Sequence, residues 1–137
     1  MIRALDISSS ALVAQRTRLN IIAGNMANAF TTHQEDGRIV PYRRRVVTFE
    51  PDQADGEGPG VHVAEILEDP SKFELRYDPG HRDAIQEGPN KGYVQYPNVN
   101  LTMEYVDALE ASRAYEANVA VMNVGKAMVQ QAIQLFA

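Results

Sequence analysis

The stretch Asn100–Phe136, NLTMEYVDALEASRAYEANVAVMNVGKAMVQQAIQLF, decides the fold. Ten of its positions alternate at spacings of three and four residues, and eight of the ten are apolar or aromatic. Side chains at these spacings share one face of an α-helix, so the pattern predicts an amphipathic helix about 50 Å long. Asn100 or Thr102 would cap its first turn. The ten positions are Tyr105, Ala108, Ser112, Tyr115, Val119, Met122, Lys126, Val129, Ile133 and Phe136.

The first 34 residues carry a similar but interrupted pattern. Leucine or methionine recurs every seven residues, and a second set falls between at the alternating spacing of a heptad. Two of that second set are polar, so the apolar stripe has gaps. The pattern predicts another amphipathic helix, whose apolar face is wider than one partner helix would cover. The first set is Leu5, Leu12, Leu19 and Met26, and the second is Ser8, Gln15 and Ile22.

The middle of the chain is marked by residues that break helices. All seven prolines and seven of the nine glycines lie between residues 37 and 97. Short strands are predicted at 46–49, 61–63 and 73–77, with a loop at 55–60. We therefore expect an α+β fold. Its long helices at 1–34 and 98–137 would pair as an antiparallel coiled coil, and 35–97 would form a small strand-rich and loop-rich segment.

Composition excludes several classes of protein. The chain has 137 residues and a net charge of -5, which fits a single folding unit without a basic field to attract nucleic acid. With no cysteine it has no disulfide framework and no thiolate nucleophile. No stretch approaches the roughly 20 apolar residues of a membrane span. The first residues, broken by Asp6 and Arg16, do not resemble a secretory signal.

Catalytic and metal-binding patterns are weak. His33, His62 and His81 do not pair at metal-ligand spacing, and each is expected to be structural or exposed. The run 43–45, three arginines, could bind an anionic partner. Alternate residues of a strand face opposite ways, however, so a solvated edge strand is the preferred interpretation. We expect no enzyme activity, no cofactor and no metal.

The pair of helices is expected to be only marginally stable as a monomer, because burying its apolar side chains does not offset the entropy lost in ordering both helices. Other copies of the chain are the simplest source of further contacts, and a patch that binds a different patch on the next copy produces rings or open filaments. A monomeric helical hairpin that binds one partner protein is the alternative. The charges agree weakly with assembly, at +2 for residues 1–34 and -2 for 93–137.

Three separated motifs resemble one known family. Residues 14–32, AQRTRLNIIAGNMANAFTT, are similar to the N-terminal signature of bacterial flagellar axial proteins, the rod and hook class, and place its paired asparagines at Asn25 and Asn28. The segments DPGH (78–81), GYVQYPNVN (92–100) and ASRAYEANV (111–119) resemble its short proximal-rod members. The sequence departs from that pattern at Gly24, Phe30 and Arg82, and by an apparent insertion at 87–91.

The resemblance implies a structural subunit of the flagellar basal-body rod, which crosses the periplasm and transmits torque. Such proteins are exported by the flagellar type III apparatus without a cleavable signal. The implied partners are copies of this chain, other rod proteins, the membrane-ring junction protein, the export apparatus and surrounding bushing rings. In such assemblies the helix pair forms an inner tube, with the C-terminal helix nearest the export channel.

Two further expectations concern order and packing. The extended linker 92–100 is expected to lie against the helices, and the terminal segments 1–30 and 100–137 are expected to become helical only on assembly.

The resemblance also implies two sets of candidate residues, one lining the channel and one forming the assembly interface. Neutral polar residues near the end of the last helix would line the channel, namely Asn123, Gln130, Gln131 and Gln134. The expected assembly interface comprises Leu5, Leu12, Leu19, Ile22, Asn25, Met26, Asn28, Tyr93, Tyr96, Pro97, Asn98, Tyr105, Tyr115, Val119, Met122, Val129, Ile133 and Phe136.

Overall fold

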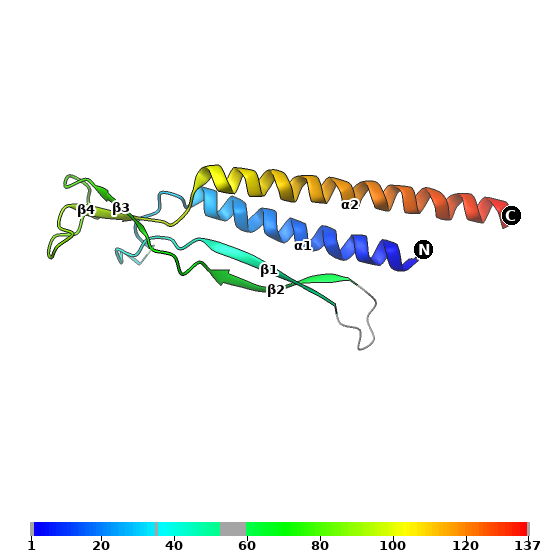
Figure 1. The fold of residues 1–137 in the computed structure, drawn as a ribbon, viewed down its shortest axis with the longest axis horizontal. Helices are drawn as coiled ribbons and strands as arrows, with labels where there is room; N and C mark the ends of the chain where they lie inside the picture. Colours follow the sequence, from blue (N-terminus) through cyan, green and yellow to red (C-terminus); the bar gives the residue numbers. More distant parts are fainter. Residues whose placement is uncertain (1, 35, 53–59, 137) are drawn as a thin grey trace.

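A computed structural model of the chain describes residues 2–34, 36–52 and 60–136. Two long helices pack together, and two small antiparallel sheets complete the fold, so the α+β prediction is confirmed (Figure 1). The elements in chain order are α1 (Ile2–Ala27), β1 (Arg45–Pro51), β2 (Val61–Glu68), β3 (Glu74–Tyr77), β4 (Tyr93–Tyr96) and α2 (Leu101–Phe136). Most of the predicted loop at 55–60 lies outside the described residues.

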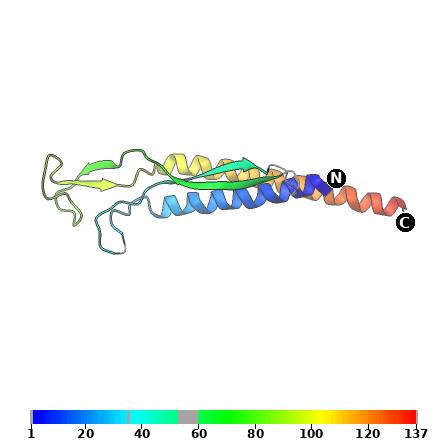
Figure 2. The ribbon, with the colours of Figure 1, turned by 90° about the horizontal axis from the view of Figure 1, so that it is seen from below.

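The two helices run antiparallel, and both chain ends lie at the same end of the pair (Figure 1). Leu5 of α1 contacts α2 at Gly125, where an added Cβ would stand 2.8 Å from Leu5 Cδ2. Since α1 begins only three residues before Leu5, the last turns of α2 extend beyond it, as both views show (Figures 1 and 2). The end of α2 therefore has no partner helix within the described part of this chain.

The first turn of α2 is capped as the sequence predicts. The Asn100 side-chain oxygen accepts hydrogen bonds from the backbone amides of Thr102 at 3.0 Å and Met103 at 3.2 Å. These amides have no acceptor within the helix, so an asparagine at this position stabilises its start. Asn100 is the cap, and Thr102 is inside the helix.

The face of α2 that meets α1 differs from the predicted stripe. The most deeply buried positions are Glu104 and Ala111, seven residues apart, and Gly125 is a further two heptads along. Tyr105 and Ile133, expected on the seam, are exposed. Small residues let the helix backbones approach closely. The line of contact with α1 is therefore displaced around α2, by about one residue, from the predicted stripe of large apolar side chains.

A long hairpin covers α1. Strands β1 and β2 pair antiparallel with a bulge between Thr48 and Phe49, and they run alongside α1 (Figure 2). Ser10 on α1 accepts a hydrogen bond from the Val61 amide at 3.1 Å, which fixes one end of β2 to the helix. The strands predicted at 46–49 and 61–63 are present, and each is longer than expected because the two pair along their length.

The second sheet lies beyond the end of the helices (Figure 1). Strands β3 and β4 pair in register from Glu74 opposite Tyr96 to Tyr77 opposite Tyr93. The Tyr77 and Tyr93 rings meet edge to face at 5.2 Å. The expectation that 92–100 lies against the helices is thus wrong for β4, whose backbone bonds to a neighbouring strand instead. Its extended conformation is as predicted.

Buried residues lie both in the helix pair and in or next to the second sheet, where Val94 is 0% and Ala84 3% exposed. Among the side chains that the structure describes, the fully buried apolar residues are Ala14 and Ile22 on α1 and Ala111 on α2. After Ala111, no residue of α2 that the structure describes is fully buried. In the described part of the chain, α2 is therefore buried near its start and only partly covered after Ala111, whereas α1 has buried residues from Ser8 to Asn25.

The decrease in burial along α2 predicts which parts of the isolated chain are well ordered. The sequence-based expectation that all of 1–30 and 100–137 orders only on assembly is therefore narrowed to the end of α2. We expect backbone amides of residues 14–27 and 101–111 to exchange slowly, and those after residue 115 to exchange at rates close to those of an unfolded chain, because local opening there exposes little buried surface. Hydrogen exchange of the monomer, read by mass spectrometry, measures both regions in one sample. Uniform strong protection along all of α2 would contradict the expectation.

Candidate functional site

Asn25 lies at the centre of a polar network between the helices and β1. Its side chain is 1% exposed. The amide nitrogen donates to the Arg45 carbonyl at 2.8 Å and to Glu104 at 3.1 Å. The amide oxygen accepts from the Arg45 backbone amide at 2.9 Å and the Tyr42 hydroxyl at 3.0 Å. All its hydrogen-bonding capacity is used inside the chain, which places this residue away from the surface.

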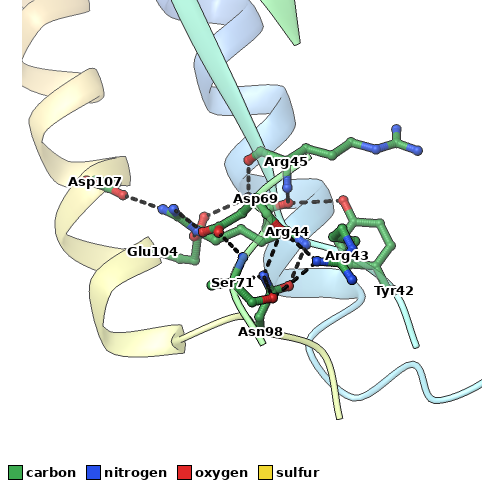
Figure 3. A network of polar contacts seen from close by, with 10 residues as sticks. Tyr42, Arg43, Arg44, Arg45, Asp69, Ser71, Asn98, Glu104 and Asp107 are labelled. Atoms are coloured by element: carbon green, nitrogen blue, oxygen red, sulfur yellow. Dashed lines mark hydrogen bonds and ion pairs between the residues drawn. The ribbon is translucent and has the colours of Figure 1, made fainter. Parts of the chain in front are cut away.

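Arg44 joins the same network to α2 (Figure 3). Its guanidinium donates to Glu104 at 2.6 Å and to Asp107 at 3.2 Å, and it lies 3.6 Å from a carboxylate oxygen of Asp69. Glu104 is 0% exposed, so its charge depends on Arg44 and Asn25 for stabilisation. We call Asn25, Arg44, Glu104, Asp107 and their hydrogen-bonded neighbours the polar junction.

The pKa values at the junction follow from these contacts. Burial alone would lower the pKa of Arg44, but the hydrogen bond to Glu104 and the nearby carboxylates of Asp107 and Asp69 outweigh it and raise that pKa above its usual value. Burial raises the pKa of the Tyr42 hydroxyl. Hydrogen bonds from Ser71 are the main cause of a lowered pKa at Asp69, with Arg44 adding to it. The junction therefore favours a fixed pattern of charges.

Asn98 and Arg43 connect the junction to the segment between the two sheets. The Asn98 side chain accepts from the Arg44 amide at 2.9 Å and donates to the Ser71 hydroxyl at 2.8 Å. The Arg43 guanidinium donates to the Asp69 carbonyl at 2.9 Å and lies over the Phe73 ring at 4.4 Å. These contacts fix where the chain leaves the helices for β3.

The arginine run is a solvated edge strand only at Arg45, which begins β1 and is exposed. As expected, alternate residues point to different surroundings, since Arg44 faces α2 while Arg45 is exposed. The prediction of solvation is wrong for Arg44, because its guanidinium pairs with carboxylates on α2 and after β2. Sequence reasoning missed this ion pair. One signal was available, because Glu104 lies one heptad before Ala111 and so shares its face of the helix. A charged residue on a buried helix face needs a partner of opposite charge.

A second cluster ties the turn after α1 to the turn after β3. Asp83, almost fully buried, accepts from the Thr32 hydroxyl at 2.6 Å, contacts His33 Nδ1 at 3.1 Å and accepts from Arg82 at 3.3 Å. The Thr32 hydrogen bond is the main reason that the pKa of Asp83 is lowered. This histidine has a structural role, and the same holds for His81, which accepts from the Asp83 amide.

The residues expected to assemble fall into several environments. Ile22 and Pro97 are buried, and Asn98 belongs to the polar junction. Leu5, Leu12, Leu19 and Met26 on α1 are half-buried, and so is Asn28 in the turn that follows α1. On α2, Val119, Met122 and Val129 are half-buried and Tyr105, Tyr115 and Ile133 are exposed. The Tyr96 ring lies under Arg76 and near His81. The Phe136 side chain lies outside what the structure describes.

The possible channel-lining residues do not form a single strip. Asn123, Gln130, Gln131 and Gln134 are all exposed. Asn123, Gln130 and Gln134 follow one another at spacings of seven and four, so they share one strip of α2. Gln131 is about 60° or more round the helix from them, toward the exposed Val124 and Leu135.

The described residues show neither a metal-binding cluster nor a membrane-spanning helix. Among the residues that the structure describes, no three His, Cys, Asp or Glu side chains gather as metal ligands would. Within residues 2–34, 36–52 and 60–136, no helix is both long and apolar enough to cross a bilayer. The groups of the polar junction bind one another, so this arrangement holds the helices and strands in place.

Comparison with known families defines the class. The family described as flagella basal body rod protein matches residues 5–32, and the C-terminal family described as flagellar basal body rod FlgEFG protein matches residues 90–135. These two regions contain most of the helix pair. Together with the fold, they define a flagellar basal-body rod protein.

Full-length relatives make the assignment more specific. The chain is 43% identical to the flagellar basal-body rod protein FlgC of Borreliella burgdorferi and 42% identical to that of Bacillus subtilis, in each case over 96% of this chain and 95% of the relative. It is 40% identical to FlgC of Salmonella typhimurium over 98% of this chain and 97% of the relative. The chain belongs to the FlgC family of flagellar basal-body rod proteins, a structural and not an enzymatic family.

Proposed function

We propose that this rod subunit assembles through its terminal helices into the torque-transmitting shaft that encloses the flagellar export channel. The accessible surface of the single chain carries this proposal. It is 9783 Å², whereas a compact monomer of 15.2 kDa exposes about 7100 Å². The excess is what an elongated subunit leaves open for neighbours to cover.

Apolar side chains on the outer face of α2 support assembly. Val121, Val124, Met128 and Leu135 are exposed and follow one another at spacings of three, four and seven residues. They form an apolar stripe on a side of the helix that α1 does not cover. Contiguous apolar surface of this kind is typical of an interaction site, and other rod subunits are the partners expected for this family.

The placement of the chain within the rod, its export route and its neighbours are proposed from the family resemblance. The division at 1–34, 35–97 and 98–137 would place the helix pair in the inner layer, with β3 and β4 outside it. The chain would reach the periplasmic rod through the type III export apparatus without a cleavable signal peptide. A membrane-ring junction protein and the surrounding bushing rings would be its neighbours.

Sedimentation separates this proposal from a monomeric hairpin that binds one partner. We expect the purified chain to form concentration-dependent oligomers at micromolar concentration and elongated or annular particles by electron microscopy, because a different patch of the next copy would cover the exposed apolar stripe. A folded monomer that stays monomeric throughout the concentration range would favour the single-partner module instead.

The channel-lining role makes a separate prediction. If Asn123, Gln130 and Gln134 face the lumen, changing Gln130 and Gln134 to leucine should slow secretion of later flagellar subunits several-fold while the rod still assembles, because an apolar strip retains passing unfolded chains. Secreted subunits in the culture medium measure the effect. Gln131→Leu, on a different side of the helix, is the matched control. Equal secretion by the double variant and the control would refute the lining role.

A further inference from the structure

Both chain connections to the second sheet pass through one place. Within the described ranges, the backbones of β3 and β4 lie close to each other and to no other helix or strand. The chain enters this sheet through residues 69–73 and leaves it through 97–100. The Asn98 side chain donates to the Ser71 hydroxyl at 2.8 Å, so the two connections lie side by side. A body attached at one place can pivot about it, as hinged domains do.

A second attachment joins different parts of the chain. Asp83, in the segment between β3 and β4, is 5% exposed and accepts a hydrogen bond from the Thr32 hydroxyl at 2.6 Å. His33 Nδ1 lies 3.1 Å from the same carboxylate oxygen, and His33 Nε2 lies 3.0 Å from the Arg82 guanidinium. These four residues join the turn after α1 to the second sheet. We call Thr32, His33, Arg82 and Asp83 the latch.

Each half of the latch is anchored in its own part of the fold. On the helix side, the Thr31 carbonyl accepts from the Tyr42 amide at 3.0 Å, and the Tyr42 hydroxyl donates to Asn25 of the polar junction at 3.0 Å. On the sheet side, the Ile85 amide donates to the Tyr93 carbonyl at 2.9 Å, which ties the segment after the latch to β4. The latch therefore connects two parts that are each held firmly elsewhere.

The polar contacts of the latch are the stronger hold at this joint. The buried apolar residues next to it in the sequence are Ala29 and Ala84. A single methyl group gains less from burial than a large apolar side chain does. Removing one partner of a buried, charged hydrogen bond, in contrast, leaves the other partner unpaired. Loss of the Asp83 carboxylate or of the Thr32 hydroxyl should therefore weaken the joint most.

We propose that the latch holds the second sheet at a fixed angle to the helix pair, so that the sheet turns with the helices when the rod transmits torque. The role in torque rests on the proposed function, whereas the fixed angle rests on the contacts of the latch. Two attachments, one at the chain connections and one at Asp83, stop a pivoting motion that a single attachment would allow. Arg82 departs from the family pattern, so its contact with His33 adds to the hold in this chain.

Distance measurements on the dilute monomer test the fixed angle, since the sequence contains no cysteine that would compete for labels. Spin labels are attached at Asn20→Cys on α1 and Leu75→Cys on β3, both exposed positions. The same pair is placed in chains that also carry Asp83→Ala or Thr32→Val. Pulsed electron paramagnetic resonance should then show an at least about twofold broader distance distribution, because hinge motion is no longer restrained.

Asp78→Ala is the matched control, because the Asp78 carboxylate accepts from the Gly80 amide within its own turn. It should keep the narrow distribution of the unmodified chain. Circular dichroism checks that every variant keeps its helices, and Thr32→Val changes no charge. Equal widths for Asp83→Ala, Thr32→Val and Asp78→Ala would refute the latch, whatever the chain does in a rod.

The role in torque is tested in a strain whose FlgC is replaced by this chain, because a viscous medium raises the load on the shaft. We expect Asp83→Ala to swim several-fold more slowly than Asp78→Ala in viscous medium, and at a similar speed in dilute medium, since the terminal helices still assemble. Equal speeds in viscous medium would refute the torque role even if the distance distribution broadens. If the unmodified chain does not restore swimming, the proposed function fails and the torque role fails with it.

Discussion

Replacing Arg44 with methionine is expected to lower the free energy of unfolding by about 3–5 kcal/mol, because it leaves the buried Glu104 carboxylate without its cationic partner. Glu104 is 0% exposed and would keep only the Asn25 amide as a donor among the contacts described above. Urea unfolding followed by helical circular dichroism measures the change. The junction half of the helix pair is the part expected to be ordered in the monomer, so the measurement does not require assembly.

Two variants make this result specific. Arg45→Met removes the neighbouring arginine, which is exposed, and should cost less than about 1 kcal/mol. The double variant Arg44→Met with Glu104→Gln removes both charges and should recover most of the loss, because an unpaired buried charge no longer remains. Equal effects of Arg44→Met and Arg45→Met would show that the polar junction does not hold the fold together.

Changing Leu12 or Leu19 to aspartate is expected to abolish rod assembly and swimming while leaving export intact. Both leucines are half-buried on α1. A carboxylate that is covered in the assembled rod costs several kcal/mol, whereas the export apparatus handles an unfolded chain that has no packing to lose. The variants are expressed in a strain that lacks the chromosomal copy. Soft-agar swimming reports assembly, and the amount of the variant outside the cytoplasm reports export.

Asn20→Asp provides the matched control, since it adds the same carboxylate one residue from Leu19 at an exposed position. It should swim normally. Swimming by the Leu12→Asp and Leu19→Asp strains would show that this heptad frame is not part of the assembly interface. Loss of swimming by the control would show that α1 tolerates no added charge at all.

The sequence was sufficient for features that repeat locally. Two long amphipathic patterns predict the helices, and the clustering of proline and glycine predicts the irregular middle. Asn100 as a helix cap follows from the residue types that satisfy the first amides. The three strands were expected from β-branched and aromatic residues, although pairing made two of them longer.

Features that depend on distant residues were not predictable in the same way. The position of β4 depends on its pairing with β3, and the seam of the helix pair depends on small residues such as Ala111 and Gly125 that carry little hydrophobic signal. The link between Arg44 and Glu104 spans 60 residues of sequence. No periodic pattern connects those two positions, so only the folded chain reveals the ion pair.

Electron cryomicroscopy of basal bodies tests most directly whether this chain is a rod subunit built through its terminal helices. The basal bodies would come from a strain whose FlgC is replaced by this chain. We expect density for α1 and α2 in the inner layer of the proximal rod, with α2 nearer the channel and β3 and β4 outside. Density that places the helix pair on the outer surface, or a rod that excludes this chain, would contradict the account.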